Sequence, residues 1–183
     1  MPIKFGEPRE HPIPRISVEA ARAGHPEALA VLYAQYAPDL LRLAFRLTGT
    51  VEDAEDVLQD VFVGLPEALR HYEERGNLRA WLRQVTARTA LMLRRRTAVR
   101  REVSLDGSTP ATAAMEPTLE QVALQRALEG LPGSLRAVFV LKVMEGYSHA
   151  EVAALLGIRR GTSEVRLYRA IRLLRSALRT TIP

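Results

Sequence analysis

Apolar residues recur every three to four positions from Val18 to about Arg101, and the alternating pattern typical of strands is absent. This spacing predicts four helices, near residues 17–23, 26–47, 50–70 and 77–101. Three glycines separate them: Gly24, Gly49 and Gly76. Pro38 marks a candidate break in the second helix, and Pro66 should kink the third, because proline lacks an amide donor and crowds the preceding turn.

Helical spacing returns in the last third of the chain and predicts helices near residues 118–130, 132–145, 148–156 and 162–179. Thr118 with Gln121, and Ser148 with Glu151, have the spacing of capping boxes. Gly157 suits the end of the third helix in this group.

Two stretches lack helical spacing. Residues 1–16 contain four prolines and are predicted to form a flexible N-terminal arm. Residues 102–117 are rich in Ser, Thr, Ala and Pro, and are predicted to form a flexible linker because few of their side chains can build a core. The expected fold class is therefore all-α, with two small helical domains, residues 17–101 and 118–183, joined by that linker.

The composition narrows the classes of protein to which the chain can belong. Hydrophobic residues make up 47% of the 183, which is enough for real cores, and no apolar run approaches the roughly 20 residues of a membrane span. The first residues do not have the pattern of a signal peptide, so we expect a cytoplasmic protein with no membrane insertion. Lys and Arg number 26 against 21 Asp and Glu, and the net charge of +5 suits a polyanionic partner.

The sequence contains few residues in patterns typical of catalytic or metal sites. The chain has no cysteine, and its four histidines are scattered, so thiolate and histidine metal sites are not expected. It contains no phosphate loop or nucleophile motif, and carboxylates crowded on one helix are not by themselves an acid/base pair. We therefore expect no cofactor and no enzymatic activity.

Residues 148–179 have the organisation of a helix-turn-helix: a short capped helix, a tight turn, and a second helix that opens at Thr162. The second helix carries an apolar stripe made of Leu167, Ala170, Ile171, Leu174 and Leu178. Val165, Tyr168 and most of the arginines lie away from that stripe. Seven arginines and one acidic residue follow position 157, so the pattern favours a DNA-recognition helix over the solvated face of a helical bundle.

Two groups of arginines are candidates for contact with duplex DNA. Arg159 and Arg160 lie in the turn, beside the free amides at the Thr162 end of the helix, where phosphates bind. Arg166 and Arg169 lie on the face that would enter a groove.

A second arginine-rich segment lies in the N-terminal half. Residues 83–101 contain seven arginines and no acidic residue, Trp81 lies on the same predicted helix, and Tyr72 lies in the loop before it. Aromatic rings beside an arginine-rich face can stack unpaired bases while the arginines neutralise the backbone, which is typical of sites for single-stranded nucleic acid. In the alternative interpretation, Trp81 belongs to the core and the last arginines only complement the helix C-terminus.

Five carboxylates and no basic residue fall between Glu52 and Asp60, on one predicted helix. Glu52, Asp56 and Asp60 follow one another at i, i+4 spacing, where like charges cost roughly 0.2–0.5 kcal/mol per pair. The helix dipole offsets this repulsion only in the first turn. A basic surface packed on the helix would relieve the remaining repulsion. That surface belongs either to a partner protein or to the arginine-rich helix of the same chain. The sequence favours neither over the other.

Two long stretches resemble bacterial RNA polymerase sigma factors. The sequence "LYAQYAPDLLRLAFRLTGTVEDAEDVLQDVFVGL", followed by "AWLRQVTARTALMLRRR", resembles region 2. The sequence "LEGLPGSLRAVFVLKVMEGYSHAEVAALLGIRRGTSEVRLYRAIRLLRSAL" resembles region 4. With only these two regions, over roughly residues 27–101 and 119–178, and a short linker between them, the chain resembles the extracytoplasmic-function (ECF) group.

The resemblance implies a sigma factor that binds core RNA polymerase and directs it to promoters. The helix that matches the acidic stretch docks on the β′ clamp helices in this family, which implies a core-binding set of Asp53, Glu55, Asp56, Gln59 and Asp60. The implied contacts of region 2 with the −10 element come from Tyr72, Trp81, Arg83, Arg88, Arg94 and Arg95. The implied contacts of region 4 with the −35 element come from Arg159, Arg160, Thr162, Glu164, Val165, Arg166 and Arg169. The polymerase β flap and an anti-sigma factor are further implied partners.

Two of the implied DNA-contact residues depart from the family pattern. Arg88 stands where members often have Asn, near the pocket for a flipped −10 base, and Glu164 stands where Lys is common. Glu164 could instead accept a hydrogen bond from a cytosine amino group. The alternative function is a stand-alone helix-turn-helix regulator that binds duplex DNA without polymerase, which would leave the acidic helix and the arginine-rich helix without linked roles.

Overall fold

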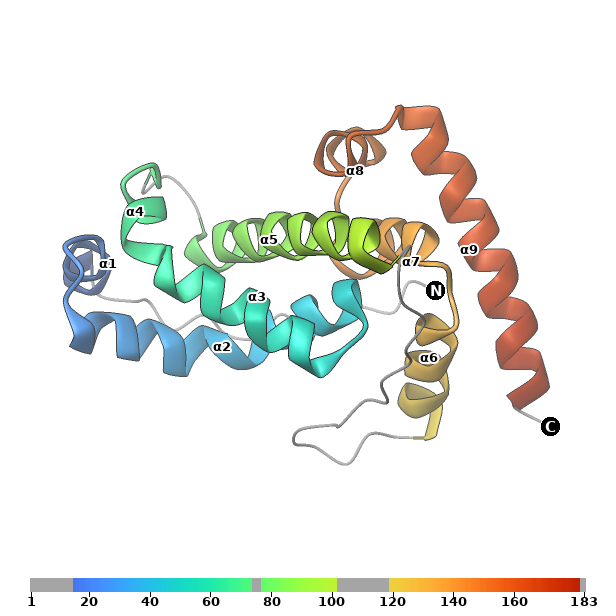
Figure 1. Ribbon diagram of the computed structural model, residues 1–183, viewed down its shortest axis with the longest axis horizontal. Helices are drawn as coiled ribbons and strands as arrows, with labels where there is room; N and C mark the ends of the chain where they lie inside the picture. Colours follow the sequence, from blue (N-terminus) through green and yellow to red (C-terminus); the bar gives the residue numbers. More distant parts are fainter. Residues whose placement is uncertain (1–14, 74–76, 102–118, 182–183) are drawn as a thin grey trace.

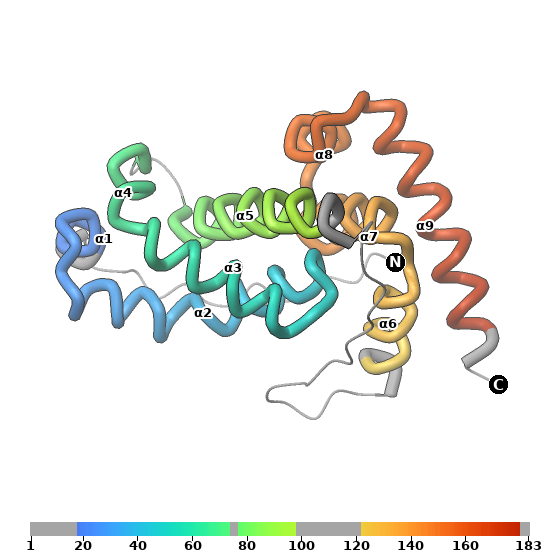
Figure 2. Tube along the Cα trace, in the orientation of Figure 1, coloured from blue at the N-terminus to red at the C-terminus, as the bar shows by residue number. Residues whose placement is uncertain are grey.

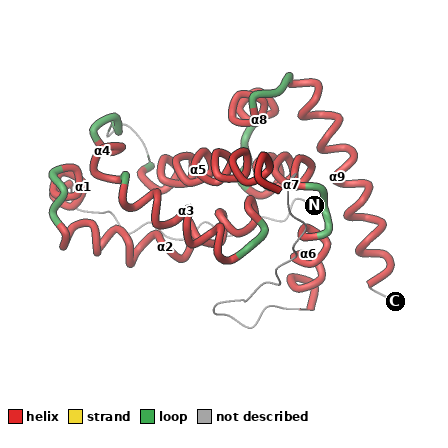
Figure 3. Tube along the Cα trace, viewed as in Figure 1, coloured by secondary structure: helices red, strands yellow, loops and turns green. Residues whose placement is uncertain are grey.

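The computed structural model describes residues 15–73, 77–101 and 119–181 (Figure 1). Every regular element in these three stretches is a helix, joined to the next by a short loop where the connection is described (Figure 3). In chain order they are α1 Arg15–Arg22, α2 Pro26–Thr48, α3 Val51–Val63, α4 Leu65–Leu69, α5 Leu78–Arg101, α6 Leu119–Glu129, α7 Gly133–Phe139, η1 Val140–Met144, α8 His149–Leu156 and α9 Arg160–Thr181. The all-α prediction is confirmed. The predicted linker, the predicted cap at Thr118, and all but the last two residues of the predicted arm lie outside the described residues.

Helix α2 lies at the centre of the N-terminal half and contacts α1, α3 and α5. Pro26 begins it at a position where a missing amide costs nothing, and Gly49 ends it in a left-handed conformation. The candidate break at Pro38 is absent, since α2 continues to Thr48. Because Pro38 has no amide hydrogen, the carbonyl of Ala34 has no donor in the next turn of the helix. Both residues are exposed, so water can bind that carbonyl.

The third predicted helix is two helices in the structure. Helix α3 ends at Val63, Gly64 follows, and α4 begins with Pro66 as its second residue. An amide in the first turn of a helix has no intrahelical acceptor, so Pro66 starts a new helix rather than kinking a long one. The change of direction brings α4 against α1.

The C-terminal half is built from α6 to α9. The predicted helix at 132–145 is an α-helix to Phe139 and then a π-helical turn, η1. Helices α6, α7 and α9, with the loop between α6 and α7, share a small apolar cluster made of Leu128, Leu131, Leu135, Ala170 and Leu174. Helix α8 precedes α9, which begins at Arg160, two residues before the predicted start.

The two halves of the chain pack against each other, and the C-terminal part of α5 contacts the start of α7 and the end of α8 (Figures 1 and 2). One apolar cluster contains residues from both halves. Helices α2, α3 and α5 contribute Leu43, Ala44, Leu47, Ala54, Val57, Val61, Ala87, Ala90 and Leu91. Helices α7, η1 and α8 contribute Ala137, Val138, Val140, Leu141 and Val152. We call this packing the closed arrangement.

Replacing Gly49 with Ala should destabilise the protein by more than replacing Gly24 with Ala. Both glycines have positive φ, 98° and 83°, where any other L-residue costs about 1–2 kcal/mol. A methyl group at Gly49 would also overlap the guanidinium of Arg136 on α7, whereas nothing lies within 4 Å of a methyl group at Gly24. Urea-unfolding curves of the two variants measure the difference. Equal losses of stability would mean that the Arg136 contact contributes nothing.

Candidate nucleic-acid and protein interfaces

The acidic residues of α3 form one exposed face. The Thr50 side chain caps the helix and accepts a hydrogen bond from the Asp53 amide at 3.2 Å. Asp53 is half-buried, and the other predicted core-binding residues are exposed. With Glu52, the exposed residues of this face are Glu52, Glu55, Asp56, Gln59 and Asp60. Within the part of the chain that the structure describes, no ion pair involves any of the five carboxylates Glu52, Asp53, Glu55, Asp56 and Asp60. The described arginine side chains of α5, from Arg83 to Arg96, therefore do not form ion pairs with them.

Apolar side chains that the sequence analysis did not assign lie beside this acidic face. Tyr33 of α2 is half exposed and packs edge-to-face on Phe62 of α3, with ring centroids 4.8 Å apart. Val63, the last residue of α3, is 76% exposed. Phe62 itself is only partly buried, so this edge of α3 is accessible beside the acidic face.

Tyr72 and Trp81 meet at the N-terminal end of α5. Their ring centroids are 5.1 Å apart, and both residues pack on the apolar cluster formed by α1 to α5. Tyr72 is only 8% exposed, and Trp81 is partly buried. The structure thus brings together the two predicted −10 aromatics, with Tyr72 in the core and one side of Trp81 accessible.

Arg83 of α5 forms the centre of an ion network. It pairs with Asp39 of α2 and with Glu145 at the end of η1, and its Nε lies 2.8 Å from Glu145 Oε2. Burial alone would lower the pKa of Arg83, but the hydrogen bonds and charges of Asp39 and Glu145 outweigh it and raise that pKa above its usual value. Burial would likewise raise the pKa of Asp39, and hydrogen bonds from Arg83 and Arg79 hold it below its ordinary value.

The other predicted −10 arginines lie further along α5. Arg94 Nη1 donates to the carbonyl oxygen of Gly133 at 2.8 Å, and Arg95 Nη2 donates to that of Leu155 at 3.2 Å. Arg88 is exposed. It lines a cavity of about 360 Å³ between α5 and α8, together with Gln84, Leu91, Met92, Arg95, Tyr147, Glu151, Ala154 and Leu155.

Local hydrogen bonds fix the geometry of α8 and α9. The predicted capping box is present: the Glu151 amide donates to Ser148 Oγ, and the Ser148 amide donates to the Glu151 carboxylate at 2.7 Å. Gly157 ends α8 with φ 65°, as predicted. His149 Nδ1 lies 2.9 Å from the hydroxyl of the buried Ser163, which ties the first turn of α8 to the first turns of α9.

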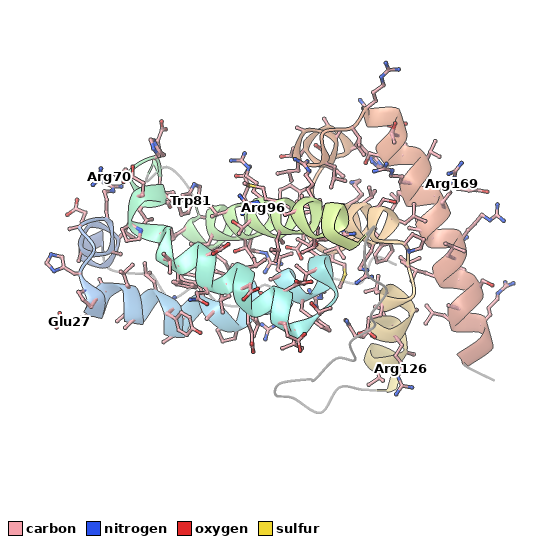
Figure 4. All side chains as sticks on the ribbon, viewed as in Figure 1. Glu27, Arg70, Trp81, Arg96, Arg126 and Arg169 are labelled. Carbon is pink, nitrogen blue, oxygen red and sulfur yellow. The ribbon has the colours of Figure 1, made fainter. Side chains whose placement is uncertain are left out.

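The exposed face of α9 combines arginines with two accessible side chains that bases could touch. Val165 is half exposed and Tyr168 is 64% exposed, and Arg169, labelled in Figure 4, lies beside them on the sequence. Arg160 Nε lies 3.0 Å from Glu164 Oε1 at the surface, so the predicted cytosine reader is paired with a predicted phosphate contact. Of the other predicted −35 residues, Arg159 is exposed, and Thr162 and Arg166 are half-buried.

Comparison with known proteins identifies the family of the chain that carries these surfaces. A family model described as Sigma-70 region 2 matches residues 32–100, and one described as Sigma-70, region 4 matches residues 121–174. The ECF RNA polymerase sigma factor SigL of Mycobacterium tuberculosis is 35% identical over 173 residues, which cover 88% of this chain and 94% of SigL. The chain belongs to the ECF sigma factors.

Other relatives agree with this assignment. The ECF sigma factor SigE of Mycolicibacterium smegmatis is 36% identical over 156 residues, and the alignment covers 80% of this sigma factor but only 60% of SigE. The sigma factor RpoE of Bartonella quintana, solved in complex with the anti-sigma factor NepR, has a TM-score of 0.64 at 25% identity, over 82% of this chain and 96% of RpoE.

The two family matches lie over different helices of the sigma factor. The region 2 match lies over α2 to α5, with the acidic face and the arginine-rich helix, and the region 4 match lies over α6 to α9, with the helix-turn-helix. No helix in the three described stretches combines the length and the apolarity needed to span a bilayer.

Proposed function

We propose that this sigma factor binds core RNA polymerase through the acidic face of α3 and directs the polymerase to its promoters. The observation that carries this proposal is the set of exposed carboxylates, from Glu52 to Asp60, that repel one another and lack a basic partner among the described residues. The basic β′ clamp helices of the polymerase would neutralise this face. Tyr33 and Val63 would extend the contact with apolar area.

Promoter DNA would then contact two separate surfaces. The −10 element would bind the α5 side of region 2, through Tyr72, Trp81, Arg83, Arg88, Arg94 and Arg95. The −35 element would bind the turn before α9 and its first turns, through Arg159, Arg160, Thr162, Glu164, Val165, Arg166 and Arg169. Tyr168, more exposed than any of its apolar neighbours on α9, adds a candidate contact with a thymine methyl or a sugar.

The remaining partners follow from the same assignment. Region 4 would also contact the polymerase β flap, and an anti-sigma factor would inhibit the free protein, as the complex of RpoE with NepR illustrates for a relative. The sigma factor would act in the cytoplasm, with no catalysis of its own. A stand-alone regulator is not favoured, because both sigma regions match in order along one chain.

Size-exclusion chromatography with purified bacterial core polymerase tests the proposal, followed by run-off transcription from a library of genomic fragments. We expect co-elution at moderate salt, and transcripts that require the sigma factor. Elution of the protein apart from polymerase, together with a shift of duplex DNA by the protein alone, would replace the proposal with the stand-alone regulator.

A further inference from the structure

Arg22, the last residue of α1, holds the turn that follows α4. Its Nε donates to the carbonyl oxygen of Leu69 at 3.0 Å, and its Nη2 donates to that of Tyr72 at 3.3 Å. The Tyr72 amide donates to the same Leu69 carbonyl at 3.1 Å. One half-buried guanidinium therefore joins both ends of the turn from Leu69 to Tyr72.

Helix α4 is too short to fix this turn by itself. It has five residues, and the last carbonyls of a helix have no partner within that helix. A positively charged donor near a helix C-terminus satisfies such carbonyls and interacts favourably with the helix dipole. Val18 and Ala21 of α1 are buried in the apolar cluster that also contains Tyr72. A packed helix therefore carries the guanidinium of Arg22 to the turn.

Through this turn, Arg22 acts on the two aromatic rings at the start of α5. The buried Tyr72 ring lies against the ring of Trp81, labelled in Figure 4, at an interplanar angle of 54°. Trp81 lies in the first turn of α5, where the Asn77 side chain accepts a hydrogen bond from the Ala80 amide and so fixes the start of the helix. Tyr72 thus supports one side of Trp81 and leaves the other side accessible to an unpaired base.

All of these contacts lie within the N-terminal half, so they do not depend on the closed arrangement. Arg22 precedes residue 32, where the region 2 match begins, so the family match gives it no role. Both of its hydrogen bonds go to backbone carbonyls, and they therefore fix the course of the chain rather than the charge of a neighbouring side chain.

We propose that Arg22 is a positioning residue for single-stranded DNA. It fixes the turn that holds Tyr72 behind Trp81, so that Trp81 presents its accessible side for stacking with an unpaired base. The identity of that DNA as the −10 element rests on the proposed function. The benefit is preorganisation, because a ring already held in the stacking orientation loses less conformational freedom when a base binds.

Arg22→Met tests the proposal, because methionine keeps an unbranched apolar stem and removes all five N–H donors. Arg22→Lys is the conservative variant, which retains the charge but lacks the planar fork that reaches both carbonyls. The charge-matched control is Arg70→Met, whose arginine follows α4, is 66% exposed and pairs with Glu67 at the surface (Figure 4). The stability control is Gly49→Ala, which destabilises the protein at the end of α2.

Trp81 is the only tryptophan in the chain, so tryptophan fluorescence of the full-length protein reports on this ring alone. Quenching by acrylamide, which is uncharged, measures how accessible the ring is in the free protein. Fluorescence anisotropy of a dye-labelled single-stranded oligonucleotide of mixed sequence measures DNA affinity at several salt concentrations. Thermal unfolding verifies that each variant is folded at the temperature of the measurements.

We expect Arg22→Met to increase the quenching of Trp81 and to weaken oligonucleotide binding by about tenfold, toward the lower end of what one stacked base contributes. The loss should exceed that of Arg70→Met, which measures the effect of removing one positive charge. The slope of log K against log salt should not change, because Arg22 contacts carbonyls rather than phosphates. Arg22→Lys should lie between the parent and Arg22→Met, and both controls should show the quenching of the parent.

Unchanged quenching in Arg22→Met would overturn the proposal, and so would an equal increase in Gly49→Ala, because lost stability would then explain it. A salt slope shallower by about 0.7 in Arg22→Met would make Arg22 a phosphate contact instead. Increased quenching with no more loss of affinity than in Arg70→Met would also overturn the proposal, as would a parent that does not bind the oligonucleotide. Co-elution with core polymerase uses neither Trp81 nor DNA, so failure of the proposed function remains distinguishable.

Discussion

Replacing Asp56 and Asp60 together with lysine should weaken binding to core RNA polymerase by about hundredfold or more, because losing charge partners across an interface typically costs 2–5 kcal/mol and reversal adds repulsion. Both side chains are exposed on α3 and neither forms an ion pair within the described stretches, so the fold should tolerate the change. A titration of dye-labelled sigma factor with core polymerase measures the loss. Thermal unfolding of the free variant verifies that it is folded.

The matched control makes an equal change in net charge at residues at the other end of the domain. Glu19 and Glu27 are exposed on α1 and α2, and Glu27 lies far from α3's acidic face in Figure 4. The double replacement Glu19→Lys with Glu27→Lys should leave the affinity for polymerase nearly unchanged. Equal losses in the two double variants would mean that the net charge of the sigma factor, rather than the face of α3, determines binding.

Replacing Arg166 and Arg169 with alanine should spare polymerase binding and impair contact with the upstream promoter element. Each base contact that is lost costs about 1–3 kcal/mol, whereas each lost phosphate contact makes the slope of log K against log salt shallower by about one unit. Footprinting and salt titration of the reconstituted holoenzyme on a promoter fragment distinguish the two roles. Arg126→Ala on α6, an exposed arginine outside the helix-turn-helix, is the control (Figure 4). Unchanged protection of the upstream element would exclude α9 as the recognition helix.

The helix-turn-helix could be predicted because its signals are local. The capping box at Ser148 and Glu151 and the left-handed Gly157 fix the ends of α8, and the apolar stripe of α9 was predicted correctly from spacing alone. The start of α9 was predicted two residues late because Gly161 in its first turn is a poor helix former.

The partners of the arginines could not be predicted in this way. Arg94 and Gly133 are 39 positions apart, and Arg83 and Glu145 are 62 positions apart. A run of arginines has the same sequence whether its donors meet phosphates, carbonyls or a buried carboxylate. The packing of the halves depends on the shape of both surfaces, and the sequence pattern specifies only which face of each helix is apolar.

The length of α9 limits how much of a promoter region 4 can read. At 22 residues it rises about 33 Å, close to one full turn of B-DNA, whereas the major groove curves away from any straight rod within a few base pairs. With α9 in the groove as proposed, side chains up to about Tyr168 and Arg169 would follow the groove floor, and Arg172, Arg175 and Arg179 would lie where the rod leaves the duplex. The later arginines would set how tightly and how salt-dependently the duplex is held, and only the first turns would discriminate between promoters.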